Sequence, residues 1–262
     1  EVTSTEGTRL VKAQALDQAT TQATNAENQY RVAKDNLSKA QSILDSLTTT
    51  SITYPAGYAE ALKAYFKNPT EENSKKLHEI AKKGMITAGF KTPDGGNSYY
   101  SNPVSPFKQS EVDKKTVIEN VNYLSTEIQE ELASFNAHLI NDFRRVMGTD
   151  DIPVLVNRDM QKVAQKATQL STNQYGHDQA TLDVVAKEVG LNKGNQGFLS
   201  ENIGFQKTGD VVTLADLKQQ SYNNIVMMLF HDKLADWGHA LNFAGLNRKS
   251  VMLQYIGVAT RK

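Results

Sequence analysis

The sequence of 262 residues contains no cysteine. Disulfide bonds, thiolate metal sites and cysteine nucleophiles are therefore excluded, although this absence does not identify a cellular compartment. No apolar run approaches the ~20 residues that a membrane-spanning helix needs. The chain begins with Glu1, where a signal peptide or an initiator methionine would normally stand, so we expect a mature or excised piece of a longer protein.

An excess of charge of either sign is also missing, because 29 Lys and Arg residues balance 29 Asp and Glu residues. Both halves of the chain are close to neutral, so a basic surface for a phosphate backbone or an anionic membrane is not indicated, and we expect no nucleic-acid partner. Hydrophobic residues make up 39% of the chain, which is enough to bury at least one sizeable core.

The first part of the chain carries a heptad pattern. There is no Gly or Pro between Thr8 and Tyr54, which predicts one helix of roughly forty residues. Half of the apolar seam is alanine, so the isolated helix would be marginal in water. We expect it to pair with another helix of this chain, with a second copy in a homodimer, or with sequence outside this piece. The seam consists of Leu16, Ala23, Tyr30, Leu37 and Leu44 in one series and of Ala19, Ala26, Ala33, Ala40 and Leu47 in the other.

Two shorter helices are predicted next. The first starts near Ala56 and must stop before Pro69, because the residue that precedes a proline avoids the helical region. Thr70 caps the second helix, which is expected to end at Gly84. Antiparallel packing of this pair against the long helix would cover the alanine seam, so we assign residues 1–90 to a helical coiled-coil stalk.

A stretch rich in proline and glycine, residues 91–111, predicts a linker. The remaining residues, 112–262, show amphipathic patterns with larger apolar faces and end in a strand-like segment. Helices followed by strands, without a repeated strand–helix unit, indicate an α+β domain. Helices are expected at 117–147, 159–175, 181–189 and 214–231, and extended segments at 152–155 and 251–259.

Three histidines and one glutamate in the second domain could carry chemistry, namely His177, Glu201, His231 and His239. Histidine and carboxylate in one cleft can hold a divalent metal or move protons near neutral pH. No HExxH, GxSxG, glycine-rich phosphate loop or calcium loop is present. Spacing alone therefore also admits histidines that cap helices or are satisfied in the core.

A series of short motifs occurs in a definite order between about residues 120 and 262. They are Asn141 to Arg145 near a helix end, Pro153, His177, Glu201-Asn202-Ile203, Gly238-His239 with Asn242, and Ile256-Gly257-Val258. This order resembles the CAP superfamily, the domain of cysteine-rich secretory proteins, antigen 5 and plant pathogenesis-related proteins. The resemblance implies an α-β-α sandwich whose last strand lies beyond residue 262 or is replaced by another closure of the sheet.

The resemblance also implies a cleft, because the family cleft usually holds two histidines and two glutamates that bind zinc or another divalent ion in some members. Three positions carry over, namely His177, Glu201 and His239. No glutamate occurs between Ser221 and Trp237, where the fourth is expected, so Asp232 and His231 remain as candidates for the metal site. If the preceding helix continued to Gly238, Asp232 would share the face of His239, which slightly favours Asp232.

A heptad helix ahead of a cysteine-free domain of this kind resembles the surface-exclusion proteins encoded by conjugative plasmids of Gram-positive bacteria. The resemblance implies an extracellular, cell-wall-associated protein that limits conjugative transfer or cell–cell adhesion. If it is an enzyme, it would be a metal-dependent peptidase that cleaves a surface adhesin, so a surface protein or a wall component would be its partner. The alternative is a non-catalytic CAP-type module on a coiled-coil stalk that binds peptide, glycan or lipid, and the missing second glutamate favours it.

Overall fold

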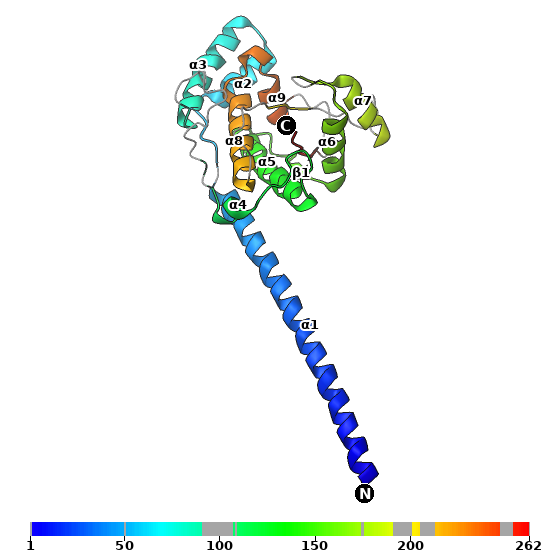
Figure 1. Ribbon diagram of the computed structural model, residues 1–262. Coiled ribbons are helices and arrows are strands. Elements are labelled where there is room, and N and C mark those ends of the chain that lie inside the picture. The colour runs from blue at the N-terminus through cyan, green and yellow to red at the C-terminus, as the bar shows by residue number, and fades with distance from the viewer. Residues whose placement is uncertain are drawn as a thin grey trace. The chain divides into compact units, whose positions relative to one another are not determined.

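The computed structural model describes residues 2–49, 51–90, 107, 109–173, 176–190, 201–204, 213–246 and 254–261. The chain divides into one compact unit that spans Glu1–Asp45 and another that spans Ser46–Lys262. Figure 1 labels their helices and strands. In the part of the chain described, no helix combines the length and the apolar character needed to cross a membrane.

The first unit consists of most of α1 (Val2–Thr49), whose last residues belong to the second unit. This helix is continuous, as the heptad segment predicted. Threonine hydroxyls within it donate to the carbonyl one turn earlier, for example Thr20 to Leu16 at 2.8 Å. The large apolar side chains that the structure describes in this helix are solvent-exposed, and Leu16, Tyr30 and Leu37 each expose about 70% of their surface. That a partner helix covers this apolar seam remains a prediction.

The second unit begins with a helical hairpin, α2 (Tyr58–Lys67) and α3 (Glu71–Thr87). Thr70 caps α3 by accepting the backbone N–H of Asn73 at 3.3 Å. The apolar faces of the hairpin, with Tyr58, Leu62 and Leu77, lie in the same core as residues of the helices that follow. The pair assigned to the stalk from sequence therefore belongs to the core of the second unit, because its faces carry large side chains that fill a globular interior.

Gly84 does not end α3, contrary to expectation. A Cβ at this position would lie 2.7 Å from the ring of Phe230, so the glycine permits close packing of α3 on the later helix α8 (Leu214–Phe230). The helix instead ends beyond Thr87, where Gly89 adopts a positive φ of 94° and the Phe90 N–H returns to the carbonyl of Met85 at 3.1 Å. This arrangement is a common helix terminator.

The helix expected at 117–147 begins only at Thr126, as α5 (Thr126–Met147). A short helix, α4 (Glu111–Lys115), precedes the expected range, and Val117 between the two helices forms an isolated antiparallel bridge with Thr213. Ser125 caps α5 by accepting the Ile128 N–H at 3.4 Å, so local capping outweighs the helical spacing of the apolar residues before it. Most of the expected linker, residues 91–106 and 108, lies outside the described residues.

Three later helices match the expected segments within a few residues, namely α6 (Arg158–Leu170), α7 (Gln179–Glu188) and α8 (Leu214–Phe230). The short helix α9 (Gly238–Phe243) was not predicted. The strands β1 (Val154–Val156) and β2 (Gln254–Ile256) pair in parallel, with Leu155 opposite Tyr255. Residues 251–253 of the expected last strand lie outside the described residues. Helices with a small sheet make the unit α+β, as predicted.

Two polar residues of α5 join the sheet to the helices. Asn141 accepts the N–H of Val154 at 2.7 Å and donates to the carbonyl of the same residue at 3.0 Å. Arg144 is buried and donates to the carbonyls of Ile152 at 2.7 Å and Phe243 at 3.0 Å. The Asn and Arg motif of the sequence thus fixes β1 and the end of α9 on α5.

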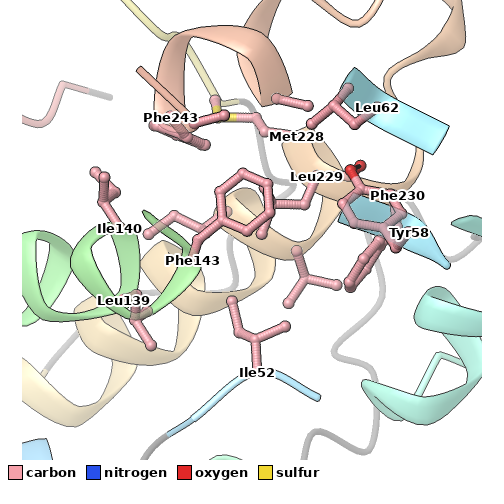
Figure 2. Packing of buried hydrophobic residues seen from close by; sticks show 14 of the residues in the cluster. Ile52, Tyr58, Leu62, Leu139, Ile140, Phe143, Met228, Leu229, Phe230 and Phe243 are labelled. Carbon is pink, nitrogen blue, oxygen red and sulfur yellow. Dashed lines mark hydrogen bonds between the residues drawn. The ribbon is translucent and has the colours of Figure 1, made fainter. Parts of the chain in front are cut away.

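The main core lies where α2, α3, α5, α8 and α9 meet. Figure 2 shows Phe143 among side chains of α2, α5, α8 and α9. The rings of Tyr58 and Phe230 meet edge to face at 5.1 Å between centroids, and the Tyr58 hydroxyl donates to the Leu229 carbonyl. Each fully buried side chain of this size contributes roughly 1.5–3 kcal/mol, so the hairpin is an integral part of the core.

Candidate functional site

His177 lies in the segment that joins α6 to α7. Asp178 holds both ends of this segment, because its carboxylate accepts the N–H of Thr172 and the N–H of Thr181, each at 3.0 Å. The Nδ1 of His177 lies 3.0 Å from Oε2 of Glu201. The histidine side chain is 51% exposed and the glutamate 28% exposed. This first pair is therefore open to solvent.

His239 lies in the first turn of α9, and its Nδ1 is 2.6 Å from Oδ1 of Asp232. The other carboxylate oxygen of Asp232 accepts the N–H of Ala240 at 3.1 Å. Asp232 is only 3% exposed, and this burial raises its pKa above the usual 3.8, although the hydrogen bond from His239 acts in the opposite direction. The second pair is therefore more sheltered than the first.

A strained turn connects the two members of the second pair. Helix α8 ends at Phe230 instead of His231, and a short 3-10 turn over Lys233–Ala235 follows. Asp236 and Trp237 then adopt left-handed φ angles of 50° and 60°, which cost energy in residues other than glycine. The carbonyl of Asp232 accepts the N–H of Trp237 at 3.0 Å. This turn brings Asp232 to His239. The two residues therefore meet without the continuous helix to Gly238 that the sequence argument assumes.

Trp237 anchors that turn in the core. Its side chain is completely buried, and its Nε1 donates to Oγ of Ser74 on α3 at 3.1 Å. The indole is therefore a wall of the core, and the α2–α3 hairpin supports the loop that carries Asp232 and His239.

The two histidine–carboxylate pairs face one another. The rings of His177 and His239 have centroids 6.4 Å apart and are inclined by 35°. A further contact ties their segments together, since Asn242 donates to Oδ1 of Asn202 at 3.1 Å. Each histidine uses Nδ1 for its carboxylate, so Nε2 is the ring nitrogen left for a ligand. The structure thus gathers two imidazoles in one partly open site.

Four of the residues proposed from sequence lie together here, namely His177, Glu201, Asp232 and His239. His231 is instead the residue that follows α8, and His78 of α3 is among its electrostatic neighbours. The support from Ser74 had no signal in the sequence, because it precedes Trp237 by 163 positions. Asn202 and Asn242 were visible within the motifs, but their contact was not predicted.

The donor set fits a divalent ion only in part. Within the described ranges, no group of three or more His, Asp or Glu residues is arranged to hold one metal ion. A histidine that binds metal through one nitrogen usually donates its other N–H to a carboxylate, and both pairs have this form. Nε2 of His177 and of His239 are therefore the protein ligands that the arrangement offers, with Glu201 and Asp232 as the groups that orient them.

Comparison with known proteins identifies the fold. No protein-family model matches the sequence, and no curated protein matches it either. A solved structure, the CAP domain of enterococcal PrgA, superimposes with a TM-score of 0.51 and 21% sequence identity, over 76% of this chain and 76% of that one. The chain therefore has a CAP-like fold, as the order of its motifs indicated.

Proposed function

We propose that the chain belongs to a surface protein of a Gram-positive bacterium that limits conjugative transfer or cell–cell adhesion, in the manner of surface-exclusion proteins. The fold shared with the CAP domain of enterococcal PrgA and the ordered motifs support this role. Residence at the cell wall is part of the same proposal. The CAP-like unit would meet the partner, a surface adhesin or a wall component.

The observation that carries the proposal is the pair of facing histidines. Each imidazole has a carboxylate on Nδ1, at 3.0 Å in one pair and 2.6 Å in the other, which fixes the tautomer and leaves Nε2 as the other ring nitrogen. Histidine changes its protonation state near neutral pH, so such a pair can accept a proton from water and return it to a leaving group. Hydrolysis of a peptide bond needs these two transfers.

In this mechanism the two histidines have different catalytic roles. His239, oriented by the buried Asp232, would act as the base that removes a proton from the attacking water. His177, oriented by Glu201 and more exposed, would donate a proton to the departing amine. If a divalent ion such as zinc occupied the two Nε2 atoms, these nitrogens could not also transfer protons, and the ion would instead supply polarisation of the peptide carbonyl.

A second candidate is a non-catalytic module that binds a peptide, glycan or lipid. It is favoured by the exposure of His177, 51% of whose side chain contacts solvent, and by the lack of a three-residue metal cluster among the described residues. In this case the histidine–carboxylate pairs would hold the loops of a groove in place, and surface display alone would limit contact between cells.

The experiment is a mating assay with recipient cells that display the chain on their wall. We expect display to reduce plasmid uptake and cell clumping, and to release fragments of an adhesin into the medium. His177→Ala and His239→Ala should abolish these effects at equal display, whereas the control His138→Ala, on α5, should preserve them. Reduced uptake without dependence on either histidine would support the binding module. Unchanged uptake and clumping would overturn the proposed role.

A further inference from the structure

A lysine that the proposed site does not use is buried between two carboxyl groups. Lys218 of α8 exposes 1% of its side chain, as does Asp113 of α4. Its Nζ lies 2.8 Å from Oδ2 of Asp113 and 2.7 Å from Oε1 of Glu131 on α5. The centroid of the Phe135 ring lies 5.9 Å from the same nitrogen. An amine and a carboxyl group are thus held in contact in a largely dry environment.

The charges of this cluster do not balance. One ammonium faces two carboxylates, so full ionisation leaves a net negative charge where little water can screen it. Burial of charge is costly because the interior has a low dielectric constant, and a lysine shared between two acids cannot neutralise both. A bond between Lys218 and Asp113 would remove the two most buried charges together. Glu131, whose side chain is 21% exposed, would keep its charge near solvent.

We infer that Lys218 and Asp113 condense to an intramolecular amide bond, with Glu131 as the proton relay. The hydrogen-bond contact between Nζ and Oδ2 places the amine beside the carboxyl carbon and replaces a bimolecular encounter with a local step. Glu131 contacts the same nitrogen from a second helix. Burial of both reacting groups then protects the product from hydrolysis.

The reaction balances without a further reagent. Nζ gives a proton to Glu131 and attacks Cγ of Asp113, so that the C–N bond forms and the bond from Cγ to Oδ2 breaks. Two protons in all pass from Nζ to Oδ2, and this oxygen leaves as water. Glu131 carries the protons and returns to its starting state, as a general acid–base group does. Nothing is oxidised or reduced.

The bond would tie α4 to α8 across 105 positions of sequence. Helix α4 has only five residues, so few non-covalent contacts hold it. With the bond in place, a pull on the chain before α4 would reach α8 through a covalent link. The segment between residue 113 and residue 218 would become a closed loop that remains closed after unfolding.

Intact-protein mass spectrometry of the complete folded chain tests the inference. We expect a mass lower than the sequence mass by one water molecule. Tryptic digestion should then give a branched peptide that joins residues 109–114 to residues 208–233. A mass equal to that of the sequence would overturn the inference, and so would a loss of water that peptide sequencing places elsewhere.

Two variants test whether Glu131 acts as a proton relay or whether the closeness of Lys218 to Asp113 is sufficient for the bond to form. Glu131→Gln keeps the size of the side chain and removes the proton carrier, so we expect the bond to form about a hundredfold more slowly or not at all. The control is Glu111→Gln, which removes a carboxylate that contacts Lys114 at 2.6 Å on the exposed face of α4, and it should keep the full loss of water. Equal bond formation in Glu131→Gln would refute the role of Glu131.

Discussion

Trp237 donates its indole N–H to the hydroxyl of Ser74, across 3.1 Å in space and 163 positions in sequence. The bond connects the α2–α3 hairpin to the turn that holds Asp232 beside His239. The hairpin therefore acts as a support of the histidine site, although it lies outside the part of the sequence that carries the CAP motifs.

Removal of that support is expected to destabilise the second unit. Ser74→Ala leaves the buried indole N–H without its partner, which costs about 1–3 kcal/mol of unfolding free energy. Denaturant unfolding measures the change. Ser134→Ala is the control, since the Ser134 hydroxyl only donates to the Glu130 carbonyl within α5, and it should change stability by less than about 0.5 kcal/mol. Equal effects of the two variants would contradict the assigned role of Ser74.

Strain in the turn gives a second prediction. Asp236 has a positive φ of 50°, so Asp236→Gly should stabilise the folded chain by roughly 1 kcal/mol. Asp236→Ala removes the same carboxylate but keeps a Cβ, and it should bring no such gain. Thermal unfolding compares the two variants. A melting temperature of the alanine variant equal to or above that of the glycine variant would contradict strain in the left-handed backbone of Asp236.

The pH dependence of stability follows from the raised pKa of Asp232, which burial causes. Between the unfolded and the folded pKa, the folded chain binds more protons than the unfolded chain. The contribution of this group is therefore complete below the usual value of 3.8 and is lost as the pH rises through the folded pKa. The stability of the wild type relative to Asp232→Asn should therefore fall as the pH rises above the usual value of 3.8.

Asp178 provides the matched comparison for that titration. Its pKa is lowered, chiefly by the N–H groups of Thr181 and Thr172, so its contribution is present above the usual value and is lost on acidification. The stability of the wild type relative to Asp178→Asn should therefore rise with pH. Parallel trends for Asp232→Asn and Asp178→Asn would contradict the assignment of opposite shifts.

A fourth prediction concerns α1, whose exposed apolar seam needs a partner. A peptide of residues 2–49 should gain helicity as its concentration rises, and sedimentation should show association between copies. Leu37→Asn, at a seam position that is 69% exposed, should prevent the association, whereas Asp35→Asn, away from the seam, should not. A peptide that is fully helical and monomeric at every concentration would contradict the need for a partner.

Sequence reasoning found the features that depend on local chemistry and motif order. The cap of α3 at Thr70 and the end of α2 before Pro69 depend only on neighbouring residues, so both could be predicted from the sequence. The histidines and Glu201 could be brought together only because their motifs resemble a known fold. Periodicity alone would not have placed them in one site, since the residues that separate them form other elements.

The expectations from sequence that proved wrong concern residues whose structural role depends on tertiary packing. Gly84 was read as a helix stop, but its lack of a side chain serves the contact with Phe230. The sequence favours assigning the α2–α3 hairpin to the stalk because the pair could cover the alanine seam, and only the packing of residues such as Tyr58 reveals its core position. The turn at Asp236 and Trp237 could not be predicted, because burial of the indole compensates a backbone conformation that local propensity disfavours.

The central claim is that His177 and His239 form one site through their Nε2 atoms, and calorimetric titration with zinc tests it most directly. We predict that the wild type binds zinc at about pH 7.5 and much more weakly at about pH 5.5, where protonated imidazoles cannot bind metal. His177→Ala and His239→Ala should each lose the binding, and His138→Ala should retain it. Absence of binding by the wild type, or equal binding by the wild type and both site variants, would contradict the claim.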